Sequence, residues 1–321
     1  MKFVLSCDNN YFRYVYVAIK TLLENNKENK SLKVVFIEEN VSKTNLEHLK
    51  NLGQEFNREV EIISFKMPEV FEKLPAYGES KTTFAKFTFS SLFSDDVVVF
   101  LDPDVLVLGD ISSFDDIDMT GYMFAGVIEN LPNYHHFYAN LGEDDSYING
   151  GVLICNLKLW RERNFENEVI EYMSTNTKNF NYDQGILNEL CKGEIKVIHP
   201  KYNALAEIFQ IKSAKKLLKR YKFSKYYSQS ELDDAINNPI IVHFTYFLYG
   251  KPLMIGCKHP YANVFLDNLN SSPLDKNLYK NNLGYKIKIR RFVLRFFPFS
   301  VYVLFERLLD IRRKREMKKQ L

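Results

Sequence analysis

The stretch VVVFLDPDVLVLGD, residues 97–110, places two carboxylates inside an otherwise apolar run. Charged side chains are seldom left in a buried run without a partner, because their desolvation is costly. In a strand, residues i and i+2 point to the same side, so Asp102 and Asp104 would present their carboxylates together. Pro103 cannot donate a hydrogen bond to a neighbouring strand, which places the pair at a strand end or a sheet edge. The stretch therefore predicts a buried strand that leads into a polar site.

Short apolar runs alternate with helical patterns around this stretch. Runs typical of buried strands occupy residues 2–6, 32–38, 59–65, 122–128, 151–155, 194–198 and 239–244. Helical spacing of apolar residues follows Asn10, which is placed to cap a helix, and helices are also expected over 83–93, over 166–173 and from Asp183 onward. Continuous apolar strands separated by helices indicate an α/β fold with a mainly parallel sheet covered on both faces. In such sheets, ligands bind beyond the carboxyl ends of the strands.

Length and composition fit one large α/β domain or two small ones. The chain has 321 residues, and its 46% hydrophobic content is sufficient for a sizeable core. The opening MKFVLSCDNN reaches polar residues too early for a signal peptide, and no apolar run approaches the length of a membrane span. The cysteines lack metal-type spacing and are typical of a cytosolic protein. Glycine motifs for dinucleotides or for a P-loop are absent from the sequence.

The net charge of +3 conceals an asymmetry along the chain. Residues 285–321 contain twelve Lys and Arg against three Asp and Glu, a net +9, whereas residues 1–284 carry 31 basic and 37 acidic side chains, a net −6. A basic segment interleaved with bulky apolar residues is typical of a helix that lies on an anionic membrane surface. A helix packed on the body with solvated charges is the alternative. Because the basic residues are concentrated in this single segment, no nucleic-acid partner is expected.

Within this basic segment, one helical stripe would gather the largest apolar side chains. Pro298 should kink or break the helix. The residues that can share the stripe are Phe292, Phe296, Phe299, Val303 and Leu304.

The carboxylate pair at 102 and 104 needs a counter-charge, which a divalent cation could supply. Oxygen ligands suit Mg²⁺ or Mn²⁺, and both ions also accept phosphate oxygens. A second D-x-D, Asp116 to Asp118, lies in a polar stretch and is expected to be a solvated turn. Only the first pair follows an apolar run, but the pair alone leaves metal binding and a turn or ion pair open.

Several spaced motifs resemble those of glycosyltransferase family 8, the family of glycogenin and the bacterial lipooligosaccharide galactosyltransferases. FLDPDVLVLGDI resembles the metal-binding D-x-D segment of that family, and SYINGGVLICNL (146–157) its N-G-G segment. NYDQGILN (181–188), IHPKYN (198–203) and IVHFTYFLYGKP (241–252) resemble the segments that follow. The resemblance covers about residues 1–260 and implies the nucleotide-diphosphosugar transferase fold called GT-A. Expected divisions are a catalytic domain over 1–260, a connecting segment over 261–284 and the membrane-associating tail over 285–321.

The resemblance also implies roles for individual residues. Asp102, Asp104 and His243 would bind the metal, expected to be Mn²⁺ with Mg²⁺ possible. Gln184 would lie next to the anomeric carbon, and Asp183 would accept a bond from a sugar hydroxyl. Donor-binding roles fall to Asp8, Asn10, Tyr11, Lys86, Asp102, Asn149, Gly150, Gly151 and Lys251.

Structural roles are the alternatives for several of these residues. His243 could be a hydrogen-bonded histidine of the core, and Asp183 could cap the helix that follows. Asn10 and Tyr11 could cap a helix and fill the core, and the glycines could serve a tight strand entry.

The sequence departs from the family pattern at several places. Lys86 stands where the family usually has arginine, so a bidentate contact becomes a point charge. In place of H-F-x-G the chain has His243-Phe244-Thr245-Tyr246, and its glycine comes later, at Gly250. The geometry of the loop that leads to Lys251 should therefore differ from that of the family.

By the resemblance, the reaction would be retaining transfer of galactose or glucose from a UDP-sugar, forming an α linkage. Because Gln184 is a poor nucleophile, front-face attack is favoured over double displacement. The acceptor could be a lipid-linked glycan, a cell-surface polysaccharide or a glycoprotein. A cytoplasmic location on the inner face of the cell membrane is expected. The competing functions are a metal-dependent nucleotide-sugar hydrolase and a non-catalytic, membrane-tethered UDP-sugar-binding protein.

Overall fold

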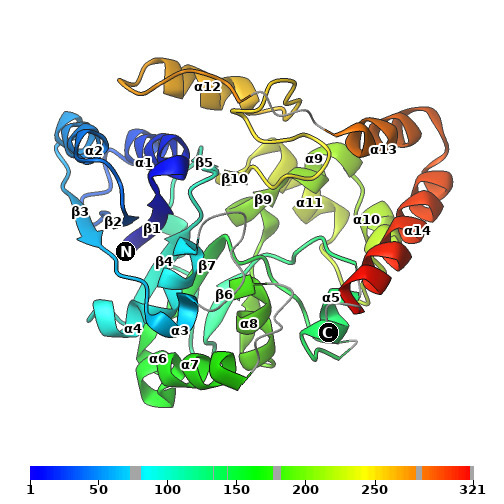
Figure 1. Cartoon of the computed structure of the whole chain (residues 1–321), viewed down its shortest axis with the longest axis horizontal. Coiled ribbons are helices and arrows are strands. Elements are labelled where there is room, and N and C mark those ends of the chain that lie inside the picture. The colour runs from blue at the N-terminus through cyan, green and yellow to red at the C-terminus, as the bar shows by residue number, and fades with distance from the viewer. Residues whose placement is uncertain (73–80, 133, 143, 176–181, 280–283, 319–321) are drawn as a thin grey trace.

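A mixed seven-stranded sheet forms the centre of the molecule (Figure 1). The computed structural model describes residues 1–72, 81–132, 134–142, 144–175, 182–279 and 284–318. In spatial order the strands are β3 (Val60–Ser64), β2 (Lys33–Glu39), β1 (Lys2–Asp8), β4 (Val97–Leu101), β7 (Val152–Asn156), β6 (Phe124–Gly126) and β8 (Ile195–Val197). Strand β7 runs antiparallel to β4 and β6, and the other pairings among the described strands of this sheet are parallel. The expected α/β fold with a mainly parallel sheet is confirmed.

Both faces of the sheet are buried, as the continuous apolar strands predict. In β4, Val99 and Leu101 face one apolar cluster, and Val98 and Phe100 face the other. The first cluster lies under α1 (Phe12–Asn25), α2 (Lys43–Glu55), α9 (Ala206–Ile211), α10 (Ala214–Tyr221), α11 (Gln229–Asn237) and α12 (Ala262–Asn270). The second lies under α3 (Glu69–Glu72), the 3₁₀ helix η2 (Thr82–Thr88), α4 (Phe89–Leu92), α6 (Leu157–Arg163), α7 (Phe165–Thr175) and α8 (Tyr182–Leu190).

The D-x-D segment leads from the seven-stranded sheet into a small second sheet. The second sheet contains β5 (Val105–Val107), β10 (Ile241–His243) and β9 (Ala204–Leu205), with β10 in the middle. The sequence did not separate β4 from β5, and it missed the two-residue β9. Asp102 and Asp104 lie in the turn between β4 and β5, so their placement at a strand end is confirmed, but the two residues do not belong to a strand.

Two of the expected helices differ in detail from those in the structure. Asp8, not Asn10, caps the first helix, because its carboxylate accepts from the backbone N–H groups of Asn10 and Tyr11 at 3.0 and 3.1 Å. The cap opens a short 3₁₀ turn, η1 (Asn9–Tyr11), before α1. The helix expected over 83–93 is divided into η2 and α4.

The basic segment forms a helical hairpin of α13 (Tyr285–Phe296) and α14 (Phe299–Lys318), at the right of Figure 1. The break at Pro298 is confirmed. The prediction of a single apolar stripe is wrong, because Val303 is 2% exposed and faces the body whereas Leu304 is 61% exposed. Residues 280–283 and 319–321 of the expected segments, and Asn181 of the D-Q segment, lie outside the described residues.

Charged side chains form much of the contact between the hairpin and the body. Glu306 of α14 is 0% exposed and pairs with Arg220 of α10 at 3.1 Å and with Arg290 of α13 at 2.5 Å. Arg220 also pairs with Asp310 of α14 at 2.8 Å. Removing one member of a buried ion pair leaves an uncompensated charge, which costs more than the intact pair contributes.

We therefore expect Glu306→Ala to lower the free energy of unfolding by about 3 kcal/mol, because the buried Arg220 and the partly buried Arg290 lose a partner. The matched control is Glu47→Ala, which removes an exposed glutamate from α2 and should change stability by less than about 0.5 kcal/mol. Urea unfolding monitored by circular dichroism measures both. Equal midpoints for the two variants would contradict the prediction.

Candidate active site

The sheet topology brings the expected motifs to one edge. Strands β1 and β4 are parallel, so Asp8 and Asp102 follow the same ends of neighbouring strands. Strand β7 is antiparallel to β4, so the segment that precedes it lies at this edge too. The backbone N–H of Asp102 donates to the carbonyl of Gly151 at 2.6 Å, which joins the D-x-D and N-G-G segments directly.

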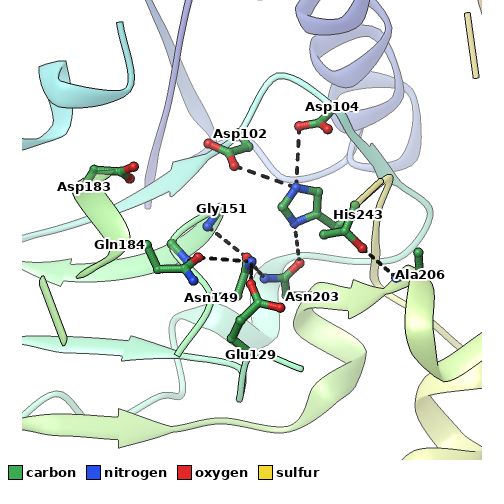
Figure 2. Close-up of polar contacts among 12 residues, drawn as sticks. Asp102, Asp104, Glu129, Asn149, Gly151, Asp183, Gln184, Asn203, Ala206 and His243 are labelled. Carbon is green, nitrogen blue, oxygen red and sulfur yellow. Dashed lines mark hydrogen bonds and ion pairs between the residues drawn. The ribbon is translucent and has the colours of Figure 1, made fainter. Parts of the chain in front are cut away.

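Asp102, Asp104 and His243 converge at this edge (Figure 2). Nε2 of His243 lies 3.7 Å from Oδ2 of Asp102 and 3.5 Å from Oδ1 of Asp104. One potential ligand atom from each residue lies within 4.8 Å of the others. The described residues therefore place two carboxylate oxygens and one imidazole nitrogen around a common point.

The hydrogen bonds of His243 indicate its tautomer, and hence which ring nitrogen has a lone pair available for a metal. The amide nitrogen of Asn203 donates to Oδ1 of Asn149 at 2.8 Å, so the amide oxygen of Asn203 is free to accept from Nδ1 of His243 at 3.1 Å. By this network the hydrogen of the neutral ring is on Nδ1, and Nε2 carries the lone pair. A lone pair facing two carboxylates is repulsive unless a proton or cation lies between them. The donor set fits a divalent cation such as Mn²⁺ or Mg²⁺.

Burial and neighbouring charges separate the acidities of the two aspartates. Burial raises the pKa of Asp102 to about 6, although Lys86 and His243 act in the opposite direction. Asp104 is also buried, but Lys251 and His243 outweigh burial and hold its pKa well below the usual range. Nζ of Lys251 lies 2.6 Å from Oδ2 of Asp104. Burial lowers the pKa of His243, but the charges of Asp104 and Asp102 and the hydrogen bond to Asp104 together outweigh burial and raise that pKa overall.

A second group of polar side chains lies beside the N-G-G segment (Figure 2). Oε1 of Gln184 accepts from the backbone N–H of Gly150 at 2.8 Å, and Oδ1 of Asn149 accepts from that of Gly151 at 2.9 Å. The amide nitrogen of Asn149 donates to the carboxylate of Glu129. These bonds hold Gln184 against the backbone with its side chain at the surface of a cleft.

Lys86 and Asp183 form a buried ion pair beneath this group. Nζ of Lys86 lies 2.5 Å from Oδ2 of Asp183, donates to the carbonyl of Gly150 at 2.9 Å and lies 4.1 Å from the centre of the Phe100 ring. Asp183 lies within the first turn of α8 and lines the cleft, while Lys86 does not. The lysine therefore supports the cleft from below.

Most of the expected site residues line one cleft of about 400 Å³. Those that do are Tyr11, Asp102, Asp104, Asn149, Gly150, Asp183, Gln184, His243 and Lys251. Asp8, Asn10, Lys86 and Gly151 lie behind the surface or beside it. Gly151 is required by space, because a Cβ there would be 2.3 Å from Cε1 of His243 and 2.5 Å from Oδ2 of Asp102.

The sequence missed two buried glutamates of the cleft. Glu129 follows the run 122–128, so the rule that selected Asp102 could have found it, whereas Glu207 follows a strand too short to recognise. Burial raises the pKa of Glu207 to about 8, with a further contribution from the charge of Glu129, and burial also raises the pKa of Glu129. Glu207 therefore favours the protonated form near neutral pH, in which its carboxyl can donate a hydrogen bond.

Comparison with known proteins identifies the family and several relatives of this chain. The model of the family "Glycosyl transferase family 8" matches residues 2–252. General stress protein A of Bacillus subtilis is 25% identical over 82% of this chain and 91% of its own length. A lipopolysaccharide 1,2-glucosyltransferase of Escherichia coli is 26% identical over 85% of this chain and 79% of its own length.

A solved structure shares the fold. The galactosyltransferase LgtC, determined with donor and acceptor sugar analogues, superimposes with a TM-score of 0.72 at 21% identity, covering 86% of this chain and 97% of that one. The architecture is therefore the GT-A fold. Because the family model matches most of the chain, the protein belongs to glycosyl transferase family 8 and is a glycosyltransferase.

Proposed function

We propose that this glycosyltransferase is a metal-dependent, retaining enzyme that transfers galactose or glucose from a UDP-sugar to a hydroxyl of a cell-surface glycan or glycoprotein. The observation that carries the proposal is that the Asp102–Asp104–His243 group and Gln184 line the same cleft. One end of the cleft suits a metal with a diphosphate, and the other suits a sugar. The relatives include a glucosyltransferase and the galactosyltransferase LgtC, so both hexoses are compatible with the family.

In this proposal the donor lies across the three metal ligands. Asp102, Asp104 and His243 would hold Mn²⁺, with Mg²⁺ as a substitute, and the bound ion would supply positive charge to the leaving diphosphate. Lys251 adds a second positive charge at the same end. Its Nζ lies 3.4 Å from the hydroxyl of Tyr11 and 5.1 Å from the centre of the Tyr11 ring.

The first βα turn shapes the uridine end of the cleft in this proposal. The carboxylate of Asp8 fixes the backbone of Asn10 and Tyr11, and Tyr11 supplies an aromatic surface. Asp8 and Asn10 therefore act on the nucleoside mainly by holding this turn in place.

In this proposal, the residues at the sugar end of the cleft act by positioning the donor sugar. Asn149, Gly150 and Gly151 bring backbone close to the sugar, Asp183 accepts from a sugar hydroxyl, and Lys86 holds Asp183 in place through their buried ion pair. Gln184 places its amide dipole against the positive charge that develops at the anomeric carbon. The departing phosphate oxygen takes the proton of the acceptor hydroxyl as the new bond forms on the same face, and UDP leaves with that proton.

We expect Mn²⁺-dependent release of UDP from UDP-galactose or UDP-glucose, and a loss of about 10²-fold or more in Asp102→Asn and Asp104→Asn, since each removes a carboxylate charge from the metal site. The matched control is Asp116→Asn, which changes the exposed second D-x-D and should keep full activity. Release of hexose 1-phosphate would favour the hydrolase alternative, and no turnover with intact UDP binding would favour the non-catalytic alternative. Full activity in excess chelator would contradict the metal assignment.

For Gln184→Ala, we expect kcat to fall about 10²-fold while the affinity for the UDP-sugar changes by less than about threefold, because the amide would act mainly on the charge of the transition state. The product should be the α-anomer, which proton NMR of the glycoside identifies. A β-anomer, or a covalent glycosyl adduct on any carboxylate detected by mass spectrometry, would count against front-face retention.

We also propose that the C-terminal hairpin binds the anionic inner face of the cell membrane, in the cytoplasm. Among the described residues, no helix combines the length and apolarity needed to cross a bilayer. The outward faces of the hairpin are apolar and exposed at Tyr285, Ile289, Phe292, Phe296, Val301, Leu304, Leu308 and Ile311. Basic side chains flank these faces and are exposed at Lys286, Lys288, Arg295, Arg312, Arg313 and Arg315.

The arrangement of the hairpin favours a lipid surface over simple packing on the body. Its buried face contains the charged Glu306 and Asp310, while its exposed face is apolar. Contiguous apolar surface of this kind marks an interaction site. Each basic residue near an anionic surface contributes about 1 kcal/mol, so several together suffice for reversible binding.

The expected result is co-sedimentation of the full chain with vesicles of phosphatidylcholine containing about 30% phosphatidylglycerol, weakened by salt. The double variant Phe296→Ser/Leu304→Ser should bind about tenfold more weakly, because it removes apolar contact area. The matched control, Ile255→Ser/Val264→Ser, changes exposed apolar residues elsewhere and should bind as the wild type does. Equal partitioning of the two double variants would rule the hairpin out as the membrane contact.

A further inference from the structure

The loop of residues 244–250 joins two residues of the polar site. It begins after His243, at the end of β10, and it leads to Lys251. Both flanking residues contact one carboxylate, since Nε2 of His243 lies 3.5 Å and Nζ of Lys251 lies 2.6 Å from oxygens of Asp104. The two ends of the 244–250 loop therefore meet at the proposed metal and diphosphate site.

The side chains in the middle of the loop point in two directions. Thr245, Tyr246 and Phe247 line the cleft, whereas Leu248 is 0% exposed and does not line it. Leu248 instead packs against Ile287 of α13 in a small apolar cluster separate from the two clusters of the central sheet. The middle of the 244–250 loop thus rests on the C-terminal hairpin.

Two successive arginines of α13 reinforce this contact. Nε of Arg291 donates to the carbonyl of Leu248 at 2.5 Å, a bond strengthened by the charge of the guanidinium. The guanidinium of Arg290 lies 5.7 Å from the centre of the Phe247 ring, and Glu306 of α14 holds it from the other side at 2.5 Å. The hairpin therefore holds both the backbone of the loop and a side chain that lines the cleft.

We propose that Arg291 is a positioning residue for the cleft and that the C-terminal hairpin is thereby part of the active site. Without the bond from Arg291, the backbone at Leu248 loses its charged anchor. Because both ends of the loop converge on Asp104, the added freedom reaches Lys251. This inference rests on the proposed function only for its probe, Mn²⁺ with UDP, and it does not require membrane binding.

The test compares three variants of the full chain by calorimetric titration with UDP in the presence of Mn²⁺. Arg291→Ala should weaken UDP binding about tenfold, and Arg291→Lys should restore part of the affinity, since an ammonium group can still donate to the carbonyl. The matched control is Arg295→Ala, which removes an equal charge one turn later on the same helix at an exposed position. It should bind UDP within about twofold of the wild type.

Equal UDP affinities of Arg291→Ala and Arg295→Ala overturn the proposal. If the wild-type chain does not bind UDP with Mn²⁺, the proposed donor is wrong, and amide hydrogen exchange decides the role of Arg291. The N–H groups of Thr245 and Gly250 donate within the loop or to His243, at 2.8 and 3.1 Å. Their exchange should be about tenfold faster in Arg291→Ala than in Arg295→Ala. Equal exchange of these two amides in both variants would then overturn the inference.

Discussion

The charge of Asp104 is the constraint around which the cleft is built. This carboxylate is 5% exposed, and an uncompensated charge at such a depth is too costly to keep. Lys251 supplies the compensation, as does His243 when its ring is protonated, from a segment that lies far along the chain and enters the site through β10. The pairing of β10 with β5 places that segment directly beside the turn that carries Asp104. One desolvated carboxylate thus explains why the second sheet is attached where the D-x-D turn leaves the first.

A second buried charge pair fixes the other end of the cleft, with a different consequence. Lys86 is 0% exposed, and its ammonium group contacts both Asp183 and the carbonyl of Gly150. A lysine offers a compact charge with three donors, whereas an arginine would present a planar fork that needs more room. The lysine at position 86, where the family usually has arginine, therefore suits a position behind the cleft, because its ammonium group there meets one carboxylate and one carbonyl.

The sequence predicted the sheet well because each of its major strands is buried on both faces and therefore reads as a continuous apolar run. It also found Asp102 and Asp104 from their place after such a run. Gly151 was named only by the family resemblance, and the antiparallel direction of β7 is what places it at the same edge. The short strands were missed because their positions depend on contacts between distant segments, and Glu207 was missed with them, whereas Glu129 follows an expected run and could have been found from the sequence. Asp8 was missed as a helix cap for a simpler reason: the helix starts with a 3₁₀ turn, which shifts the cap by two residues.

The C-terminal hairpin shows why the helical spacing of apolar residues does not by itself predict which face of a helix is buried. A helical stripe of apolar residues predicts which side chains share a face, but it does not say whether that face meets the body. Here, Glu306 and Asp310 face inward because they pair with Arg220, which is buried, and with Arg290, which is partly buried, so the apolar side chains on the opposite side turn outward. Helix α13 consequently has two surfaces with different partners, since Ile287 and Arg291 contact the 244–250 loop while Phe292 and Phe296 remain exposed. A change in how the exposed surface is covered would act on the same short helix that supports the cleft.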